Sequence, residues 1–425
     1  MREPLTSRFR SLAHVIALFA ASAALTGGMA RVPSAHLAVG KIAATAWPYL
    51  PGSSLPLRVD GFAAPYHAAL LGPGRLSPDG VYEIPQEALD GSALLVAGNT
   101  HGLAATSLRI ATPPRISRPF LVVASYDDGV IFHDAEDFSV LGVLATGGTP
   151  SDAAIDALGR IAATDTQGSA LTLATISPWT VLHIGGVALG DEVAIDPSTH
   201  AIFVTDRDVD GSGALTRVNP DGAVTRVVTG ATAEGLAIDD ARHVVYVANA
   251  NDGTVAEVDA LSMRLIRRFK AIERVFSLAL SPDGTRLYAI SNQSAGSPFA
   301  APGRAVAIAL QSPTPHIVAR SADLAFPLGA ALDSQSQTLF VTDEASALVD
   351  VLDAQTLRPK HAPLATCATP WKPAYDAVSA RLYVPCAGAA AIDVFDVRTL
   401  RRSANAPFTT GTYPLAVAVW HPRQA

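Results

Sequence analysis

The chain of 425 residues is poor in cysteine, in lysine and in charge of either sign. It has two cysteines, four lysines and 16% charged residues, whereas 49% of its residues are hydrophobic. This composition excludes global disorder, which requires low hydrophobicity and high charge. The net charge is −7 and no basic tract is present. We therefore expect no nucleic-acid partner, because phosphate backbones are bound through clustered Lys and Arg.

Motifs for redox and hydrolytic chemistry are missing as well. The sequence has no Cys-x-x-Cys-His for covalent haem attachment and no Gly-x-Ser-x-Gly nucleophile elbow on a strand-to-helix turn. No two histidines stand at ligand spacing in the loops that we expect to form a binding face, so a His-based metallo-lyase or lactonase site has no support. We therefore predict no cofactor, with a structural calcium ion as the one exception discussed below.

The N-terminal segment, residues 1–30, has the pattern of a secretory signal peptide. Arg2, Arg8 and Arg10 precede an apolar stretch over residues 12–25, and small residues at 28 and 30 suit a signal peptidase. No later apolar run is long enough to span a membrane. Cleavage would remove three arginines and one glutamate and leave a net charge of −9. We expect a periplasmic or secreted protein without a membrane anchor.

A short β-rich motif recurs seven times in the rest of the chain. The copies span residues 121–125, 161–165, 202–206, 245–249, 287–291, 339–343 and 382–386. Their starts are 40 to 52 residues apart, and a period of about 40–45 residues is typical of four-stranded propeller blades. Apolar inner strands such as residues 192–196 and 235–239 precede the motif. The sequence thus predicts an all-β fold with a seven-bladed β-propeller over residues 119–425.

The ends of the repeat array predict how the ring closes. The first copy, residues 121–125, has no inner strand before it, and the last apolar strand, residues 415–420, has no second strand after it. Since open sheet edges promote aggregation, we expect residues 415–420 to supply the inner strand of the first blade. The long spacing after the fifth copy indicates an insertion at residues 291–304.

The repeats resemble the YVTN-type β-propeller family. The best matches are Val-Tyr-Val-Ala-Asn at 245–249 with the strand at 254–259, and Ser-Pro-Asp-Gly-Thr-Arg-Leu-Tyr at 281–288. The resemblance covers residues 119–422. It implies the fold and leaves the activity open, because the family includes binding proteins, electron-transfer subunits and lactonase-like enzymes.

The segment before the propeller divides into two parts. Residues 31–54 are rich in Ala, Pro and Gly, and we interpret them as a linker with room for one strand. Residues 55–118 hold short β-like runs separated by turn sequences such as Pro-Asp-Gly, which is typical of a small β-sandwich. Its last two runs loosely resemble the final hairpin of bacterial immunoglobulin-like domains.

Polar side chains precede several inner strands of the predicted propeller. Propeller ligands mostly bind on the face that carries the second-to-third and fourth-to-first strand loops, and these side chains fall in such loops. Seven-fold packing would bring them to the mouth of the central channel, where a cation, an amine or a carbohydrate could bind; a solvated loop rim is the plainer interpretation. The residues are Asp152, Asp191, Glu192, Glu234, Arg274, Phe276, Trp371 and Lys372.

Two further features predict structural sites. Cys367 and Cys386 flank the inner and second strands of the last blade, and we expect a disulfide in an exported protein. Asp206, Asp208 and Asp210, followed by Gly211, match the start of a calcium loop. Position twelve is Arg217 instead of Glu, so an EF-hand is excluded. A plain polar turn is the alternative, and Arg207 could screen the acids.

These observations favour an exported, monomeric binding or scaffolding protein without catalytic activity. Its partner would be a protein, a small molecule or a carbohydrate. Two alternatives stay open, namely a lactonase-like hydrolase that uses the acids at the channel mouth, and a subunit of a periplasmic redox enzyme.

Overall fold

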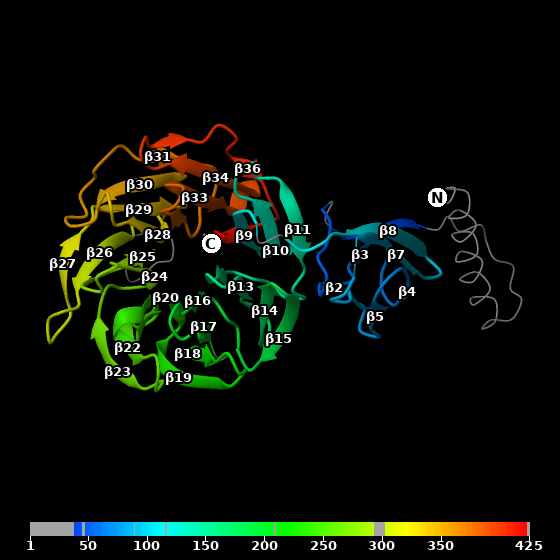
Figure 1. Ribbon diagram of the computed structural model, residues 1–425, viewed down its shortest axis with the longest axis horizontal. Coiled ribbons are helices and arrows are strands. Elements are labelled where there is room, and N and C mark those ends of the chain that lie inside the picture. Colours follow the sequence, from blue (N-terminus) through cyan, green and yellow to red (C-terminus); the bar gives the residue numbers. More distant parts are fainter. Residues whose placement is uncertain are drawn as a thin grey trace, which may run out of the picture.

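The computed structural model describes residues 38–44, 47–88, 90–114, 117–207, 210–292 and 302–422. The predicted signal peptide lies outside these residues. Within them the chain is built from β-strands and two short 3-10 helices, and it holds no helix that is long and apolar enough to cross a membrane. Figure 1 shows sheets arranged in a ring around a central axis, with a smaller β-domain at one side.

The predicted seven-bladed propeller is confirmed. Seven antiparallel sheets form the ring, and consecutive inner strands contact one another around it. From the inner strand outward, blade 1 is β37 (Pro414–Trp420), β9 (Phe120–Ser125), β10 (Gly129–Asp134) and β11 (Val140–Leu144); blade 2 is β12 (Ala153–Ile155), β13 (Arg160–Ala163), β14 (Ala170–Ile176) and β15 (Trp179–Gly185); blade 3 is β16 (Val193–Ile195), β17 (Ile202–Arg207), β18 (Ser212–Val218) and β19 (Val224–Ala231).

The remaining four blades repeat this order. Blade 4 is β20 (Ala233–Asp239), β21 (Val244–Asn249), β22 (Thr254–Asp259) and β23 (Leu265–Lys270), with helix η1 (Asp240–Arg242) between its first two strands; blade 5 is β24 (Val275–Leu280), β25 (Arg286–Ser291), β26 (Arg304–Ala309) and β27 (His316–Arg320); blade 6 is β28 (Pro327–Asp333), β29 (Thr338–Asp343), β30 (Leu348–Asp353) and β31 (Leu364–Ala365); blade 7 is β32 (Ala374–Asp376), β33 (Arg381–Cys386), β34 (Ala391–Asp396), β35 (Arg401–Arg402) and β36 (Phe408–Thr409), with η2 (Ala387–Ala389) after β33. The predicted insertion lies between β25 and β26.

The repeated turns have a common physical basis. In the turn between the third and fourth strands an aspartate accepts hydrogen bonds from backbone N–H groups two and three residues later, as Asp259 does from Leu261 and Ser262. The residue four positions after the aspartate, such as Met263, then takes a positive φ. Asp134, Asp353 and Asp396 repeat the arrangement in their own blades. Asx turns of this kind fix the chain reversal at the outer edge of these four blades.

The hydrophobic core lies in layers between adjacent blades. The second strands are almost entirely buried, since both faces pack against neighbours; β9, β21 and β29 have no partly exposed residue. Both faces of a central strand are apolar for this reason, which explains the nearly continuous Val, Leu and Ala of the repeated motif.

The smaller domain is a β-sandwich, as predicted. One sheet has the order β3 (Val59–Asp60), β1 (Ala38–Ile42), β8 (Gly102–Ile110), β7 (Gly91–Gly98) and β4 (His67–Leu71), and the other β2 (Ser54–Pro56), β6 (Val81–Glu83) and β5 (Arg75–Leu76). The stretch of residues 31–54, expected as a linker with room for one strand, contributes part of the sandwich. It supplies β1, which pairs with β8 and β3.

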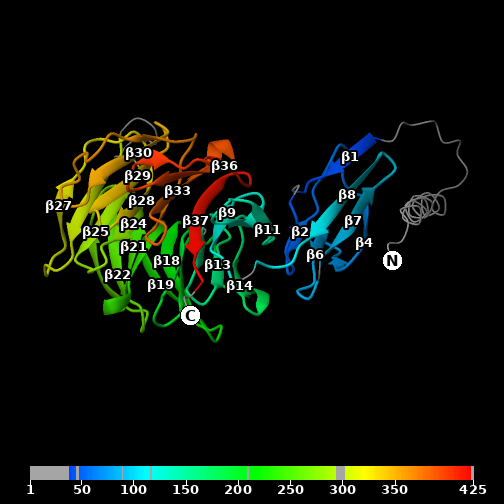
Figure 2. The ribbon, with the colours of Figure 1, turned by 45° about the horizontal axis from the view of Figure 1, so that its top comes forward.

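The end of that stretch attaches the sandwich to the propeller. Leu50 N donates to Val143 O at 2.7 Å and Val143 N to Pro48 O at 2.9 Å, so this segment runs beside β11 and covers the outer edge of blade 1. Trp179 Nε1 donates to Pro51 O at 2.9 Å, and Gln86 Nε2 to Val181 O at 2.6 Å. The sandwich therefore docks on blades 1 and 2, as Figure 2 shows from a second direction.

Ring closure occurs as the sequence predicted. Strand β37 pairs antiparallel with β9, and Trp420 lies opposite Phe120, with ring centroids 5.1 Å apart (Figure 2). A chain that ends before Pro414 should lose cooperative thermal unfolding and aggregate, because β9 would become an exposed apolar edge. A chain that ends at Trp420 keeps β37 and is the control. Equal melting curves for the two truncations would contradict the role of β37.

The predicted disulfide is also present, since Cys367 and Cys386 are bonded and 19 residues apart. Closing a loop of this length stabilises the folded state by about 3 kcal/mol through the entropy of the unfolded chain. We expect the double substitution of both cysteines by serine to lower the melting temperature, and alkylation with mass analysis to find no free thiol in the unreduced protein. Two alkylated cysteines without reductant would argue against the bond.

Candidate functional site

Several predicted residues meet inside the central channel. Lys372, just before β32 of blade 7, places Nζ 2.7 Å from Asp152 Oδ2 and 3.2 Å from Glu192 Oε1. Asp152 and Glu192 precede the inner strands of blades 2 and 3. Because blade 7 is adjacent to neither of these blades, the ion pairs run across the channel.

A second group of polar contacts lies beside the first. Arg207, at the end of β17, places Nη2 3.4 Å from Asp191 Oδ1 and Nη1 3.5 Å from Glu234 Oε1. Arg207 was not among the predicted site residues, because the sequence suggested only that it screens the acids around it. We call these six residues the channel cluster: Asp152, Asp191, Glu192, Arg207, Glu234 and Lys372.

The acids of the channel cluster are held by the backbone of the next blade. Asp152 Oδ2 accepts from Val193 N at 3.0 Å, and Glu192 Oε2 accepts from Leu236 N at 2.7 Å. In blade 4 the pairing register shifts at the start of β20, which leaves Glu234 outside the ladder. A bulge of this type redirects a side chain, and here it allows Glu234 to reach Arg207.

Burial shifts the protonation equilibria of this cluster. Burial, followed by the carboxylate of Asp191, raises the pKa of Glu234 to about 10, although Arg207 opposes the shift. Burial also raises the pKa of Glu192 to about 7 against the attraction of Lys372. Burial alone would lower the pKa of Lys372, but Asp152 and Glu192 outweigh it and the pKa is raised. At neutral pH Lys372 is charged and Glu234 is protonated.

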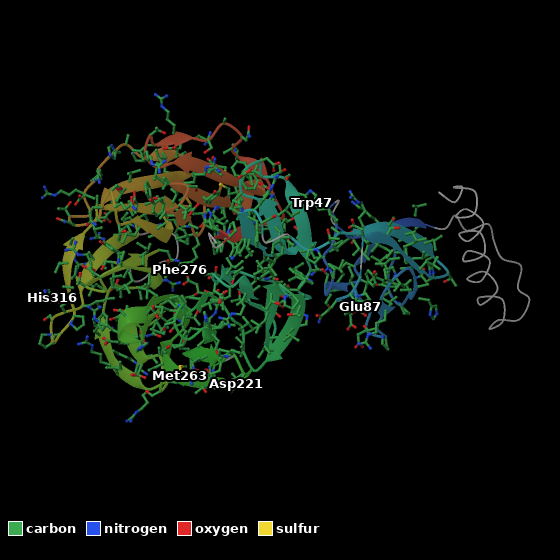
Figure 3. All side chains as sticks on the ribbon, in the orientation of Figure 1. Trp47, Glu87, Asp221, Met263, Phe276 and His316 are labelled. Carbon is green, nitrogen blue, oxygen red and sulfur yellow. A yellow bond between two sulfur atoms is a disulfide. The ribbon has the colours of Figure 1, made fainter. Side chains whose placement is uncertain are left out.

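Two half-buried aromatic side chains come from the same end of the inner strands as the charged groups. Phe276 of β24 and Trp371, which directly precedes Lys372, meet edge to face with ring centroids 6.3 Å apart. Phe276 occupies a register shift like that of Glu234 and lies close to the channel in Figure 3. Blades 5 and 7 are not adjacent, so this contact too is made across the channel. Trp371 thus adjoins Lys372 of the channel cluster in the chain and contacts Phe276 of blade 5.

Arg274 is the predicted residue that the structure places apart from the acids. It is exposed and has a positive φ of 52°. Together with Lys270, Arg304 and Arg320 it lines an open cleft of about 780 Å³ between blades 4 and 5. The channel cluster and this basic cleft are therefore separate features of one face.

The predicted calcium residues have other partners where the structure describes them. Asp206 is fully buried, and both of its oxygens face Arg226, with Nη2 2.9 Å from Oδ1; Thr216 Oγ1 donates to Oδ2. Asp210 Oδ1 accepts from Ser212 N at 2.9 Å, as in an ordinary turn, and Asp208 lies outside the described residues. Asp206 thus forms an ion pair and a hydrogen bond within blade 3. Calcium binding in this loop stays a prediction.

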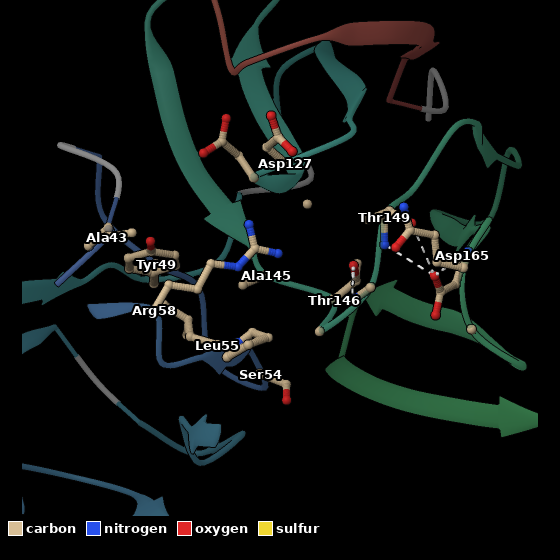
Figure 4. A pocket seen from close by; sticks show the side chains of 18 of the residues that line it. Ala43, Tyr49, Ser54, Leu55, Arg58, Asp127, Ala145, Thr146, Thr149 and Asp165 are labelled. Atoms are coloured by element: carbon tan, nitrogen blue, oxygen red, sulfur yellow. Dashed lines mark hydrogen bonds between the residues drawn. The ribbon is translucent and has the colours of Figure 1, made fainter. Parts of the chain in front are cut away.

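A cavity of about 610 Å³ lies on the same face, between the sandwich and blades 1 and 2. Figure 4 shows Arg58 of the sandwich extending towards it, with Asp127 of the β9–β10 loop on the propeller side. Thr149 and Asp165 form the opposite wall, and Thr149 N donates to Asp165 Oδ1 at 3.1 Å (Figure 4). The loops around this cavity are the same second-to-third and fourth-to-first connections that surround the channel mouth.

The comparisons with known proteins support the fold. No protein-family model and no curated protein matches the chain, so the likeness to YVTN-type and immunoglobulin-like repeats rests on the sequence motifs. A protein of unknown function from Desulfotomaculum acetoxidans is 14% identical with a TM-score of 0.60, and the match covers 72% of this chain and 99% of that one.

Two further solved structures are similar over the same extent. A candidate 6-phosphogluconolactonase from Bacteroides uniformis is 12% identical with a TM-score of 0.58, covering 71% of this chain and 99% of its own. Hydrazine synthase of Kuenenia stuttgartiensis is 14% identical with a TM-score of 0.55, covering 73% and 92%. At such identities the likeness extends to the propeller fold alone.

The raised carboxyl pKa values predict how stability depends on pH. The pKa of Glu234 is about 10 in the folded chain against 4.5 for a free side chain. The folded state therefore holds this proton more tightly, and the resulting stabilisation is complete below pH 4.5 and is lost as pH rises towards 10. Glu234→Gln should melt at a temperature that falls less between pH 5 and pH 8 than that of the wild type. The exposed Glu136→Gln is the control, and parallel pH profiles for wild type and Glu234→Gln would contradict the assignment.

Proposed function

We propose that this protein is an exported binding protein that holds a carbohydrate, or a similarly hydroxyl-rich small molecule, at the channel mouth without transforming it. The observation that carries the proposal is that Trp371, which meets Phe276 across the channel, directly precedes Lys372 of the channel cluster in the chain. A ligand pocket combines apolar and aromatic walls with a few polar groups that fix orientation, and the two sets of residues supply these parts.

The charge balance of the cluster favours a neutral ligand. With Glu234 protonated at neutral pH, the cations Lys372 and Arg207 balance Asp152 and Asp191, while Glu192 has a pKa of about 7. A charged ligand would have to break existing ion pairs. A hydroxyl group both donates and accepts hydrogen bonds, so a sugar can bind carboxylates and cations together while its apolar face covers an indole ring.

Export is part of the proposal. It is supported by the signal-like pattern of residues 1–30 and by the Cys367–Cys386 disulfide, a bond that persists mainly in oxidising compartments. We propose a periplasmic or secreted monomer.

A hydrolase is the second candidate, and Glu192 favours it. A carboxyl group with a pKa near 7 exchanges a proton at physiological pH, as a general base requires, and Glu192 lies in the channel beside Lys372. A lactone ring opened by water is a reaction that such a pair could assist.

Binding and hydrolysis can be separated in one set of measurements. The full chain without residues 1–30 would be titrated calorimetrically with a panel of neutral mono- and oligosaccharides and with δ-gluconolactone. We expect a sugar to bind and to be recovered unchanged, and Trp371→Ala to weaken binding by about 1 kcal/mol or more, which is at least about fivefold. Leu261→Ala, which removes an exposed apolar side chain from the turn between β22 and β23, should bind as the wild type does.

The outcomes distinguish the two candidates. No binding across the panel, or equal binding by Trp371→Ala and wild type, would overturn the carbohydrate proposal. Acid release from the lactone that disappears in Glu192→Gln would identify the hydrolase instead.

A further inference from the structure

Three unpartnered polar atoms converge on the face opposite the channel mouth. Asp196, Asp240 and His243 each offer one ligand atom, and these three atoms lie within 4.8 Å of one another. The unpartnered atoms of the three residues are Asp196 Oδ2, Asp240 Oδ1 and His243 Nδ1. Each atom is buried and has no hydrogen-bond partner in the part of the chain that the structure describes. Asp196 is itself fully buried. Buried polar atoms are nearly always paired, so three such atoms at one place require an explanation.

The local structure aims the three side chains at one point. Asp196 follows β16 of blade 3, and its Oδ1 accepts from Ser198 N at 2.8 Å and Thr199 N at 3.0 Å, which orients Oδ2 away from its own turn. Asp240 opens helix η1 in blade 4, and His243 ends that helix with φ 54°. The set therefore joins the first turns of two adjacent blades.

The corresponding place one blade earlier shows what is missing here. His200 Nδ1 lies 3.5 Å from Asp156 Oδ2, and Arg160 Nη2 lies 2.6 Å from the same oxygen. The arginine neutralises Asp156. Arg160 stands four residues after Asp156. Four residues after Asp196 the chain has His200, so no arginine occupies the equivalent position beside Asp196.

Arg242, the arginine nearest in sequence to Asp240 and His243, forms its ion pair with another residue. Arg242 Nη1 lies 2.5 Å from Asp239 Oδ2 and donates to Gly284 O of blade 5 at 2.8 Å. A buried carboxylate without a counter-charge is costly, and a second carboxylate close by adds repulsion. A cation between Asp196, Asp240 and His243 would relieve both.

We propose that Asp196, Asp240 and His243 bind a divalent transition-metal ion, with Zn²⁺ as the best fit. Two carboxylate oxygens and one imidazole nitrogen suit zinc, whereas calcium and magnesium prefer oxygen ligands alone. Three protein ligands leave a coordination position for water. The site is structural and fastens the first turn of blade 3 to that of blade 4.

The test uses the chain without residues 1–30, treated with EDTA and then titrated with ZnCl₂ by calorimetry, with metal content measured by mass spectrometry. We expect one Zn²⁺ per chain and a higher melting temperature with zinc. His243→Asn keeps a residue that tolerates the positive φ, and Asp240→Asn keeps the shape of the side chain; each should weaken zinc binding by at least about tenfold. His200→Asn changes the equivalent histidine of the preceding blade and should bind zinc as the wild type does.

The results decide the proposal without reference to any activity. Absence of zinc binding, or His243→Asn binding zinc as tightly as His200→Asn, would overturn it. Calcium binding of equal strength that survives His243→Asn would overturn it too, since imidazole would then play no part. Asp196→Asn is an additional variant, and if it fails to fold, the Asp240 and His243 variants still give the answer.

Discussion

The pairing of β37 with β9 is the constraint on which the rest of the structure depends. A propeller blade buries its faces only against neighbouring blades, so the ring is stable when no blade has a free side. Because the last strand of the chain completes the first blade, the two ends of the repeat array hold each other in place. Asp152 of blade 2 and Lys372 of blade 7 can form an ion pair across the channel only in a closed ring.

The channel cluster forms where the inner strands begin. Asp152, Glu192 and Lys372 come just before regular inner strands, whereas in blades 4 and 5 the register shifts there and displaces Glu234 and Phe276 from the ladder. The same structural position thus carries an acid in one blade and an aromatic ring in another. This variation brings both charged and aromatic side chains to the start of the inner strands, although every blade has the same backbone plan.

The sequence predicted the features that spacing along the chain determines, and it missed those that depend on side-chain contacts between neighbouring blades. Strand periods, ring closure and the Cys367–Cys386 bond could be read from spacing, and the acids before the inner strands were correctly placed near the channel. Arg207 was missed as a partner of Asp191 and Glu234, because its direction depends on the adjacent blade. Likewise, Asp196 and His243 are far apart in the chain and meet only through the packing of blade 4 on blade 3.

The two polar clusters lie at opposite ends of the same pair of inner strands. Strand β16 has Glu192 before it and Asp196 after it, and β20 carries Glu234 near its start and leads to His243 beyond its end. A strand rises about 3.3 Å per residue, so a metal at one end would fix the spacing of two blades within a few residues of the acids at the other. The positions of Glu192 and Glu234 relative to Lys372 depend on that spacing. The proposed metal would therefore serve the channel mouth by holding blades 3 and 4 together from the opposite face.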